Sequence, residues 1–452
     1  MKYVPIKDVI ADKISGEWGE EAIDGKGVVV IRTANFLNSG KINFSNLVRR
    51  EVDKKKVVKK RLVSGDIIIE KSGGSPTQPV GRVVIFKSPD NDTYLCNNFT
   101  SILRPKTNEV HPDYLFYVLH NNHKNGRTLR HQNRTTGIIN LKLDSYLDSE
   151  IPLPPFDDQI RIAHLLGKVE GLIAQRKQHL QQLDDLLKSV FLEMFGDPVR
   201  NERGWEKQLF SSLFSSIESG KSPKCEARPA VIGEWGVLKL AAVTSCTYKD
   251  GENKALPANE PPSIRDEVKV GDLLFSRKNT YELVAACAYV FETRPKLLMP
   301  DLIFRLVFRE DVAAHPIYIW KLLTTNSQRK LIQSLAGGAA GSMPNISKAN
   351  LRNVLLPIPP LTIQNEFAAI VEKVERIKAQ LKQSLTDLEA LYGTLSQKAF
   401  KGELDLSRVP LPAAQAPQTD QSPLPKDIIP PTDVLNLVAQ NAPPESRSEL
   451  LA

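Results

Sequence analysis

The sequence predicts an α+β protein with two mixed α/β globular units, each followed by a long helix, and the two helices pair as an antiparallel coiled coil. Two observations lead to this fold. The chain repeats itself at an offset of 205 residues, and each copy ends in apolar residues at helical spacing. Solenoid repeats have periods of roughly 20–50 residues, so this longer period indicates a duplicated domain.

The repeat is clearest where the long helices begin. Residues 151–159, IPLPPFDDQ, return at 356–364 as LPIPPLTIQ, and 16 of the 45 positions aligned from residue 151 are identical. Fainter matches lie upstream, where Asn140 aligns with Asn345 and the Gly-Asp pair at 65–66 aligns with that at 271–272. Because the globular parts diverge while the helices stay alike, we expect the helices to share one structural role and the globular units to have different targets.

The globular units are predicted over residues 1–150 and 203–355. In both units, short runs rich in β-branched residues are bounded by Gly, Pro, Asn or Asp, as strands usually are. The first unit has such runs at 28–32, 66–70, 82–87 and 101–104, and the second at 237–240, 272–276, 285–291 and 303–308. A helix then begins at Pro112 and at Pro316, since proline is tolerated in a first helical turn. Both units are therefore predicted to be mixed α/β.

The long-helix regions are predicted over 151–202 and 356–404, with the first helix itself at roughly 156–195, and apolar residues in both regions step by four and three. The predicted seam consists of Ile162, Leu166, Val169, Ile173, Leu180, Leu183 and Leu187 in the first helix and Phe367, Val371, Val374, Leu381, Leu385 and Leu388 in the second. Each series is interrupted once by a basic residue, Arg176 or Lys378. Sustained four-three stepping favours a coiled coil, and 40 helical residues extend roughly 60 Å. The alternative is two amphipathic helices that each pack on their own domain.

The bulk composition is that of a soluble basic protein. The net charge is +8 and the pI about 9.1, and residues 1–404 alone carry +11 because the rest holds six acids and three bases. This charge fits a polyanion partner such as DNA, although a basic protein without such a partner would look the same. Residues 405–452 contain nine prolines and are predicted to be a disordered tail.

No signal peptide or apolar run long enough for a bilayer is recognisable, so we expect a cytoplasmic protein without a membrane partner. The four cysteines, including Cys96 and Cys225, are far apart, which argues against a disulfide framework or a zinc site. No metal site is expected, and no catalytic residue is assigned. The run Gly220-Lys221-Ser222 lacks the upstream glycine of a phosphate-binding loop.

Candidate DNA-binding residues fall in three places. In the first unit, the loop after the Gly-Asp strand and a later basic segment mix cations with amide side chains, which are the residue types that read guanine and adenine. The corresponding loop of the second unit has the same character. The candidates are Lys71, Ser72, Gly73 and Gln78, then Arg127, Arg130, Asn133 and Arg134, and in the second unit Arg277, Lys278, Asn279 and Tyr281. Ordinary hairpin loops would explain the first and third groups equally well.

Four stretches together resemble the specificity subunits of Type I restriction-modification systems. They are IPLPPFDDQIRI at 151–162, LLKSVFLEMFGDP at 186–198, QKAFKGEL at 397–404 and GDLLFSRKNTYELV at 271–284. The resemblance covers residues 1–404 in the order target recognition domain, helix, target recognition domain, helix. The tail from residue 405 has no recognisable counterpart.

The resemblance implies a non-catalytic reader of double-stranded DNA, with one recognition domain for each half of a bipartite, asymmetric site. Two modification (methyltransferase) subunits and the restriction (translocase-nuclease) subunits would be its partners. No cofactor is expected on this chain, whereas S-adenosylmethionine, ATP and magnesium are expected on the partners. The alternatives are the recognition subunit of a related Type II system with a fused nuclease-methylase, a DNA-binding enzyme that acts alone, and a coiled-coil interaction protein without a DNA role.

Overall fold

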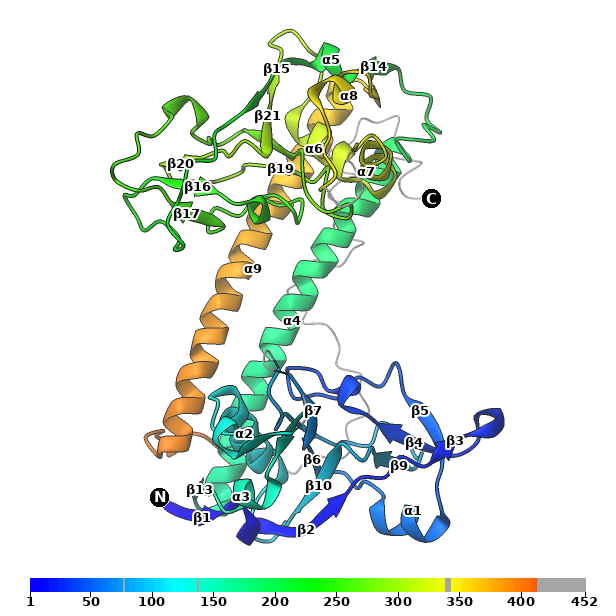
Figure 1. Cartoon of the computed structure of the whole chain (residues 1–452), viewed down its shortest axis with the longest axis vertical. Helices are drawn as coiled ribbons and strands as arrows, with labels where there is room; N and C mark the ends of the chain where they lie inside the picture. The colour runs from blue at the N-terminus through cyan, green and yellow to red at the C-terminus, as the bar shows by residue number, and fades with distance from the viewer. Residues whose placement is uncertain (76–77, 136–137, 338–342, 413–452) are drawn as a thin grey trace. The chain divides into compact units, whose positions relative to one another are not determined.

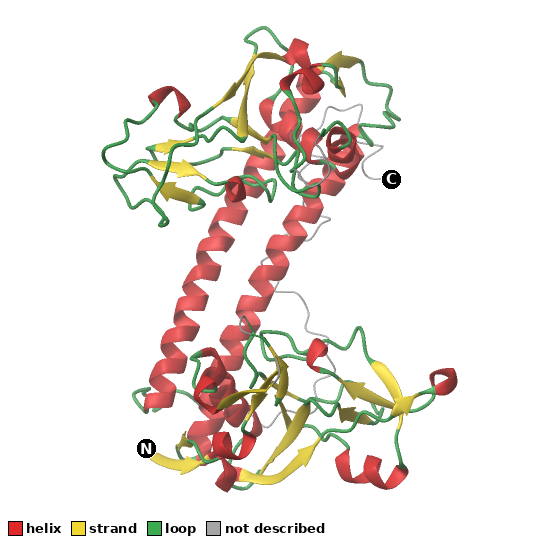
Figure 2. Ribbon diagram, in the orientation of Figure 1, coloured by secondary structure: helices red, strands yellow, loops and turns green. Residues whose placement is uncertain are grey.

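A computed structural model describes residues 1–75, 78–135, 138–337 and 343–412, and the chain divides into two compact units (Figure 1). Unit 1 contains Met1–Lys168 and the chain from Tyr392 onward, and unit 2 contains Val169–Leu391. Both units contain helices and strands (Figure 2), so the predicted α+β class is confirmed.

Each unit is built around a four-stranded antiparallel sheet with the same strand order. In unit 1 the order is β2 (Ile10–Ser15), β10 (Thr100–Pro105), β6 (Ile67–Glu70) and β8 (Val83–Ile85). In unit 2 it is β15 (Phe214–Ser219), β21 (Ile303–Phe308), β18 (Leu273–Ser276) and β19 (Cys287–Tyr289). Strands β6 and β18 are buried along their whole length, which explains why both read as continuous apolar runs rather than alternating ones.

A second sheet and a two-stranded ribbon are also duplicated. Unit 1 has the order β3 (Glu20–Glu21), β5 (Val48–Glu51), β4 (Val28–Ile31) and β9 (Tyr94–Cys96), and unit 2 has β17 (Asn253–Ala255), β16 (Gly236–Leu238) and β20 (Leu297–Leu298). Both sheets contain one parallel pair, β4 with β9 and β16 with β20. The ribbons pair β1 (Lys2–Pro5) with β13 (Glu150–Leu153) and β14 (Lys207–Leu209) with β22 (Leu355–Pro357). The repeat thus runs through the globular units, where the sequence shows it only faintly.

Short helices cover these sheets. The longest of them are α2 (Pro112–Lys124) and α6 (Pro316–Thr324), and both start at a proline as predicted. Tyr114, Leu115 and Leu119 form the buried face of α2 in the main core of unit 1. The others are α1 (Lys54–Lys60), α3 (Leu143–Leu147), α5 (Phe210–Leu213), α7 (Asn326–Gln333) and α8 (Lys348–Arg352), with 3-10 turns at Ile6–Val9, Ile23–Gly25, Thr33–Asn35, Leu129–His131, Leu240–Ala242 and Ile264–Asp266.

The repeated Gly-Asp pair connects the central strand to a neighbouring strand in both units. The glycines have φ of +96° and +92°, a backbone conformation that favours glycine. In unit 1 the carboxylate of Asp66 accepts from Val63 N at 2.9 Å and from Arg104 Nε and Nη2 at 2.9 and 2.8 Å. In unit 2 Asp272 accepts from the backbone in the same way and from Arg305 Nε at 3.0 Å. The motif therefore joins the buried central strand to its neighbour in each sheet.

A second repeated lock fixes the start of each long helix. Gln159 is 1% exposed; its Oε1 accepts from His111 N at 2.8 Å and its Nε2 donates to Pro154 O at 3.0 Å. Gln364 is fully buried; its Oε1 accepts from His315 N at 2.8 Å and its Nε2 donates to carbonyls at 2.7 and 3.0 Å. One buried amide thus ties α2 or α6 to the beginning of the long helix that follows it.

The long helices are α4 (Phe156–Phe195) and α9 (Leu361–Lys401), and they pair antiparallel. In unit 2, Arg176 Nε donates to Ser384 Oγ at 3.2 Å, and the rings of Phe191 and Phe367 are 5.5 Å apart. A later residue of α4 therefore contacts an earlier residue of α9, as in an antiparallel pair. In unit 1, Leu166 shares a core with residues near the end of α9. The predicted coiled coil is confirmed. The first helix, predicted at roughly 156–195, agrees with α4, and the wider region 151–202 also contains most of β13 and the chain after Phe195.

Burial along the seam falls into two groups. Buried seam residues are Ile162, Leu166, Val169, Leu187, Phe367, Val371 and Val374, and half-buried ones are Ile173, Leu180, Leu183, Leu381, Leu385 and Leu388. A two-helix seam can bury a side chain only partly, and full burial needs a third element. Apart from Val169, the buried positions accordingly belong to core clusters that include strands and helices of the globular units.

The chain continues to make contacts beyond Asp405, where the predicted tail begins. Leu406 packs against the core of unit 1, and Arg161 Nε donates to Val409 O at 2.8 Å. The remainder of the predicted tail, from residue 413, lies outside the described residues. Among the described helices, none combines the length and apolar character needed to cross a membrane.

Candidate nucleic-acid interface

A small sheet in unit 1 brings two of the predicted groups together. The sheet has the order β11 (Gln132–Thr135), β12 (Ile138–Leu141) and β7 (Ser72–Gly74). Asn140 of β12 is opposite Asn133 on one side and Ser72 on the other. The loop after the Gly-Asp strand and the later Arg/Asn segment, which are about 60 residues apart in the chain, thus contribute neighbouring strands to one surface.

The individual candidates on this surface differ in how exposed they are. Gly73 and Asn133 are exposed, as is Gln78, whose backbone closes a turn with Ser75 through bonds of 2.9 and 3.1 Å. The Lys71 side chain turns inward and donates from Nζ to Ser15 Oγ at 2.6 Å, and burial lowers the pKa of this lysine. The ammonium group of Lys71 is therefore bonded to Ser15 of β2 in this structure.

The basic segment leads directly into β11. Arg127 and Arg130 are exposed, and Arg130 Nε donates to His131 Nε2 at 3.1 Å. Burial lowers the pKa of His131, and a neutral imidazole can accept this bond. Arg134 belongs to β11 by its backbone. Among the described side chains, Arg127 and Arg130 are the candidate phosphate contacts of unit 1, and the side chain of Arg134 lies outside the described part.

Unit 2 presents the same construction with different side chains. Arg277 and Lys278 follow β18 as Lys71 and Ser72 follow β6, and Lys278 forms an antiparallel bridge with Asn345, the counterpart of Asn140. Ile346 N donates to Arg277 O at 2.8 Å, just as Leu141 N donates to Lys71 O at 2.8 Å. The two surfaces are therefore equivalent in backbone construction.

The unit 2 surface encloses a hollow of about 500 Å³, lined by Arg277, Lys278, Asp301, Leu302, Gly337, Met343, Asn345, Ser347 and Asn350. Arg277 is engaged inside it: Nε donates to Asp301 O at 2.8 Å and Nη1 to Asn345 Oδ1 at 2.9 Å. Lys278 is half-buried, and no carboxylate of the described residues forms an ion pair with it. The hollow thus offers an ammonium group and amide groups, which suit a base edge or a phosphate.

The other two candidates of unit 2 are in different environments. Asn279 is 6% exposed, its Oδ1 accepts from Thr280 N at 2.9 Å, and its backbone N donates to Pro344 O at 3.3 Å. Tyr281 is 55% exposed. Asn279 therefore shapes the loop, whereas Tyr281 is available for a contact. Sequence reasoning missed Asn345 as a site residue, although its alignment with Asn140 was a usable signal.

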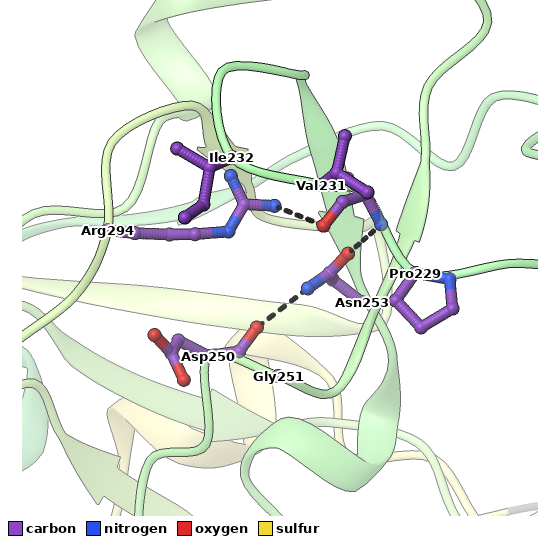
Figure 3. A pocket seen from close by; sticks show the side chains of 8 residues that line it. Pro229, Val231, Ile232, Asp250, Gly251, Asn253 and Arg294 are labelled. Carbon is purple, nitrogen blue, oxygen red and sulfur yellow. Dashed lines mark hydrogen bonds between the residues drawn. The ribbon is translucent and has the colours of Figure 1, made fainter.

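A separate hollow of about 580 Å³ in unit 2 lies beside the loop at 229–234 (Figure 3). Asn253 and Arg294 point at this loop; Asn253 Oδ1 accepts from Ala230 N at 2.9 Å, and Arg294 Nη1 donates to Glu234 O at 3.1 Å. None of the predicted site residues lines this hollow. Arg294, the one cation among the lining residues, bonds to backbone carbonyls of the loop and so stabilises the loop.

The largest charged cluster outside these surfaces is the basic run around α1. The basic run around α1 is partly neutralised, since Lys60 pairs with Glu17 at 2.9 Å; the Arg50 guanidinium lies 4.0 Å from the centroid of the Trp18 ring and keeps its charge. Within the described ranges, no group of three or more His, Cys, Asp or Glu side chains is arranged to hold a metal ion.

Each of the two units carries a polar surface of the same backbone construction, followed in the chain by a long helix. A family model described as the Type I restriction modification DNA specificity domain matches residues 1–184 and 269–389. The chain belongs to this Type I restriction-modification DNA specificity family.

Individual relatives agree with this assignment. The chain is 33% identical over 228 residues to the Type I restriction enzyme EcoEI specificity subunit of Escherichia coli, covering 49% of this chain and 37% of that protein. It is 25% identical to the EcoKI specificity subunit of E. coli strain K12, covering 82% of this chain and 81% of the relative. The crystal structure of the Type I restriction-modification S subunit from M. genitalium has the same fold, with a TM-score of 0.55, 16% identity, and coverage of 88% and 96% of the two chains.

Proposed function

We propose that this specificity subunit reads a bipartite, asymmetric DNA site, with one globular unit for each half-site. The observation that carries the proposal is the equivalent backbone construction of the two surfaces with different side chains, Lys71 and Ser72 in unit 1 and Arg277 and Lys278 in unit 2. The same scaffold with different side chains is expected to prefer different bases, which makes the site asymmetric. The net charge of +8 supports a polyanionic ligand.

In this proposal the chain itself is not catalytic. Two methyltransferase subunits would supply S-adenosylmethionine-dependent chemistry, and restriction subunits would supply ATP- and magnesium-dependent translocation and cleavage. The whole complex would work in the cytoplasm, where its DNA is. The relatives whose names describe specificity subunits support this division of labour.

The test uses the chain assembled with its methyltransferase subunits. We expect selection from a random DNA library to return one bipartite sequence, and affinity for it to fall steeply between about 50 and 200 mM salt, because phosphate contacts release counterions. The free chain should transfer no methyl group from S-adenosylmethionine.

Two results would overturn the proposal. One is methyl transfer by the chain alone. The other is a selected site that lies in a single uninterrupted block, because two units that read separate half-sites leave unread bases between them.

A further inference from the structure

The orientation of the Asn345 amide is determined by its neighbour. The guanidinium of Arg277 carries only donors, so the atom of Asn345 that faces Nη1 at 2.9 Å must be the oxygen. The nitrogen Nδ2 therefore lies on the other side of the amide group. Within the described residues, Nδ2 donates to no protein acceptor, and Asn345 lines the 500 Å³ hollow.

Arg277 is held firmly enough to act as a positioning residue. Its Nε donates to Asp301 O at 2.8 Å, its Nη2 lies 3.6 Å from Asp301 Oδ2, and its guanidinium carbon lies 5.6 Å from the centroid of the Phe304 ring. Its backbone carbonyl accepts from Ile346 N, which follows Asn345 in the chain. The side chain of Arg277 thus contacts Asn345 itself, and its backbone contacts the next residue.

We infer that Asn345 reads an adenine edge in the half-site of unit 2, and that Arg277 positions it. An amide reads adenine when its nitrogen donates to N7 and its oxygen accepts from N6. Nδ2 is available for the first bond. The second lone pair of Oδ1 is available for the other, because a carbonyl oxygen can accept two hydrogen bonds and Arg277 occupies one. The inference rests on the proposed function, since it assigns one base contact within that function.

The equivalent place in unit 1 shows why the contact is specific to unit 2. Lys71, at the position of Arg277, sends its ammonium group to Ser15 at 2.6 Å. The half-site of unit 1 is therefore expected to be independent of substitutions at Asn345 and Arg277.

The decisive variant is Asn345→Asp in the chain assembled with its methyltransferase subunits. The carboxylate keeps an acceptor for Arg277 and nearly the same shape, but it loses the only donor. We expect the preference for adenine at one position of one half-site to fall by about fivefold to a hundredfold, and cytosine to gain there because a carboxylate accepts from its N4 amine. Every other position should be unchanged.

Arg277→Met tests the positioning role. Without the guanidinium the amide can rotate, so we expect partial loss of preference at the same position and at no other. Asn326→Ala, which changes an exposed asparagine at the start of α7, is the matched control and should leave the whole selected sequence intact. Thermal unfolding of each variant establishes that it is folded.

The outcomes distinguish a failure of the proposed function from a wrong assignment of Asn345. If the unmodified complex selects no bipartite site, the proposed function fails. If the unmodified complex selects a bipartite site and the Asn345→Asp complex selects the same site, the proposed function stands and only the assignment of Asn345 is wrong. A uniform loss of affinity for all sequences in Asn345→Asp would likewise overturn the assignment, because it would make Asn345 a phosphate or structural contact.

Discussion

At the scale of single residues, the basic interruption of the α9 seam forms a buried ionic cluster. Lys378 is 5% exposed, and its Nζ contacts Asp184 Oδ1 at 2.7 Å and Glu375 Oε1 at 2.8 Å. Burial alone would lower the pKa of Lys378, but the two carboxylates outweigh it and raise the pKa above its usual value. A polar group that has its partners in only one alignment of two helices favours that alignment, so this cluster helps to fix the register.

Lys321, beside the same cluster, gives a prediction with a definite pH dependence. Burial lowers the pKa of Lys321 to about 8. Since the unfolded value is higher, the folded protein carries fewer protons than the unfolded protein between pH 8 and about 10.5, and stability from this group rises with pH over that window. At pH 7 the buried charge costs stability.

We therefore expect Lys321→Met to raise the free energy of unfolding at pH 7 by about 1–2 kcal/mol, with the advantage fading above pH 8 and vanishing near 10.5. Urea unfolding at pH 7, 9 and 10.5 would measure it. The control is Lys330→Met, an exposed lysine on α7. An equal effect of Lys321→Met at all three pH values would contradict the argument.

The residue scale is also where sequence reasoning was weakest. The residue types of the candidate surfaces were recognisable, but the direction of each side chain depends on groups distant in the chain. Asn279 turns inward because its loop packs on Pro344, and Lys71 turns toward Ser15. Neither contact leaves a local pattern in the sequence.

At the scale of elements, the spacing of apolar residues predicted the long helices and the deeply buried strands. The helices α4 and α9, and strands such as β18, follow from apolar spacing alone. Strands β7, β11 and β12 were missed because they have only three or four residues each, and their pairing joins residues as far apart as Ser72 and Asn140. The candidate surface of unit 1 is made of these missed strands, so its residues were found as two groups and not as one.

The glutamine locks lead to an element-level prediction. Gln364→Leu keeps the volume but leaves His315 N and two carbonyls without their side-chain partner. We expect it to destabilise unit 2 by about 2–4 kcal/mol. Because Trp205, Trp235 and Trp320 lie in unit 2 and only Trp18 lies in unit 1, tryptophan fluorescence during urea unfolding reports mainly on unit 2.

Gln159→Leu is the matched variant in unit 1. It should lower the stability of unit 1, followed by hydrogen exchange in α2, and leave most of the fluorescence transition in place. If Gln364→Leu leaves the fluorescence midpoint unchanged, its hydrogen bonds are not important for holding α6 to α9.

At the scale of the whole molecule, the paired helices are predicted to set the number of unread bases between the half-sites. Seven residues inserted in both α4 and α9, at the level of the Arg176–Ser384 contact, preserve the heptad seam and lengthen each helix by roughly 10 Å. This equals about three base pairs of DNA and about a third of a helical turn.

We expect the double insertion to fold and either to shift the preferred spacer or to abolish specific binding, with the base preference of each half-site retained. A random-spacer library measures both. Insertion in α4 alone should break the register and destabilise the protein. An unchanged spacer after the double insertion would show that the helices do not set it.

Exchange of one globular unit is the second prediction at this scale. Replacing unit 1 by that of another family member should change one half-site and leave the other as it was. A junction at residue 150 would cut β13 from its partner β1, so the exchange should extend through Pro154. The foreign unit must also accept Phe400 of α9, whose ring lies 6.2 Å from that of Tyr114. A change in both half-sites would mean that the units read jointly.

The division of the chain also determines the order in which it can fold on the ribosome. Unit 2 is one continuous segment, Val169–Leu391, but unit 1 needs residues from Tyr392 onward, including Ala399 in its main core. At about 5–20 residues per second, the intervening segment takes roughly 10–45 s to synthesise. During that time the apolar face of α2 lacks its contacts with the end of α9. Nascent unit 1 is therefore the part of the chain that most needs a chaperone, although it is made first.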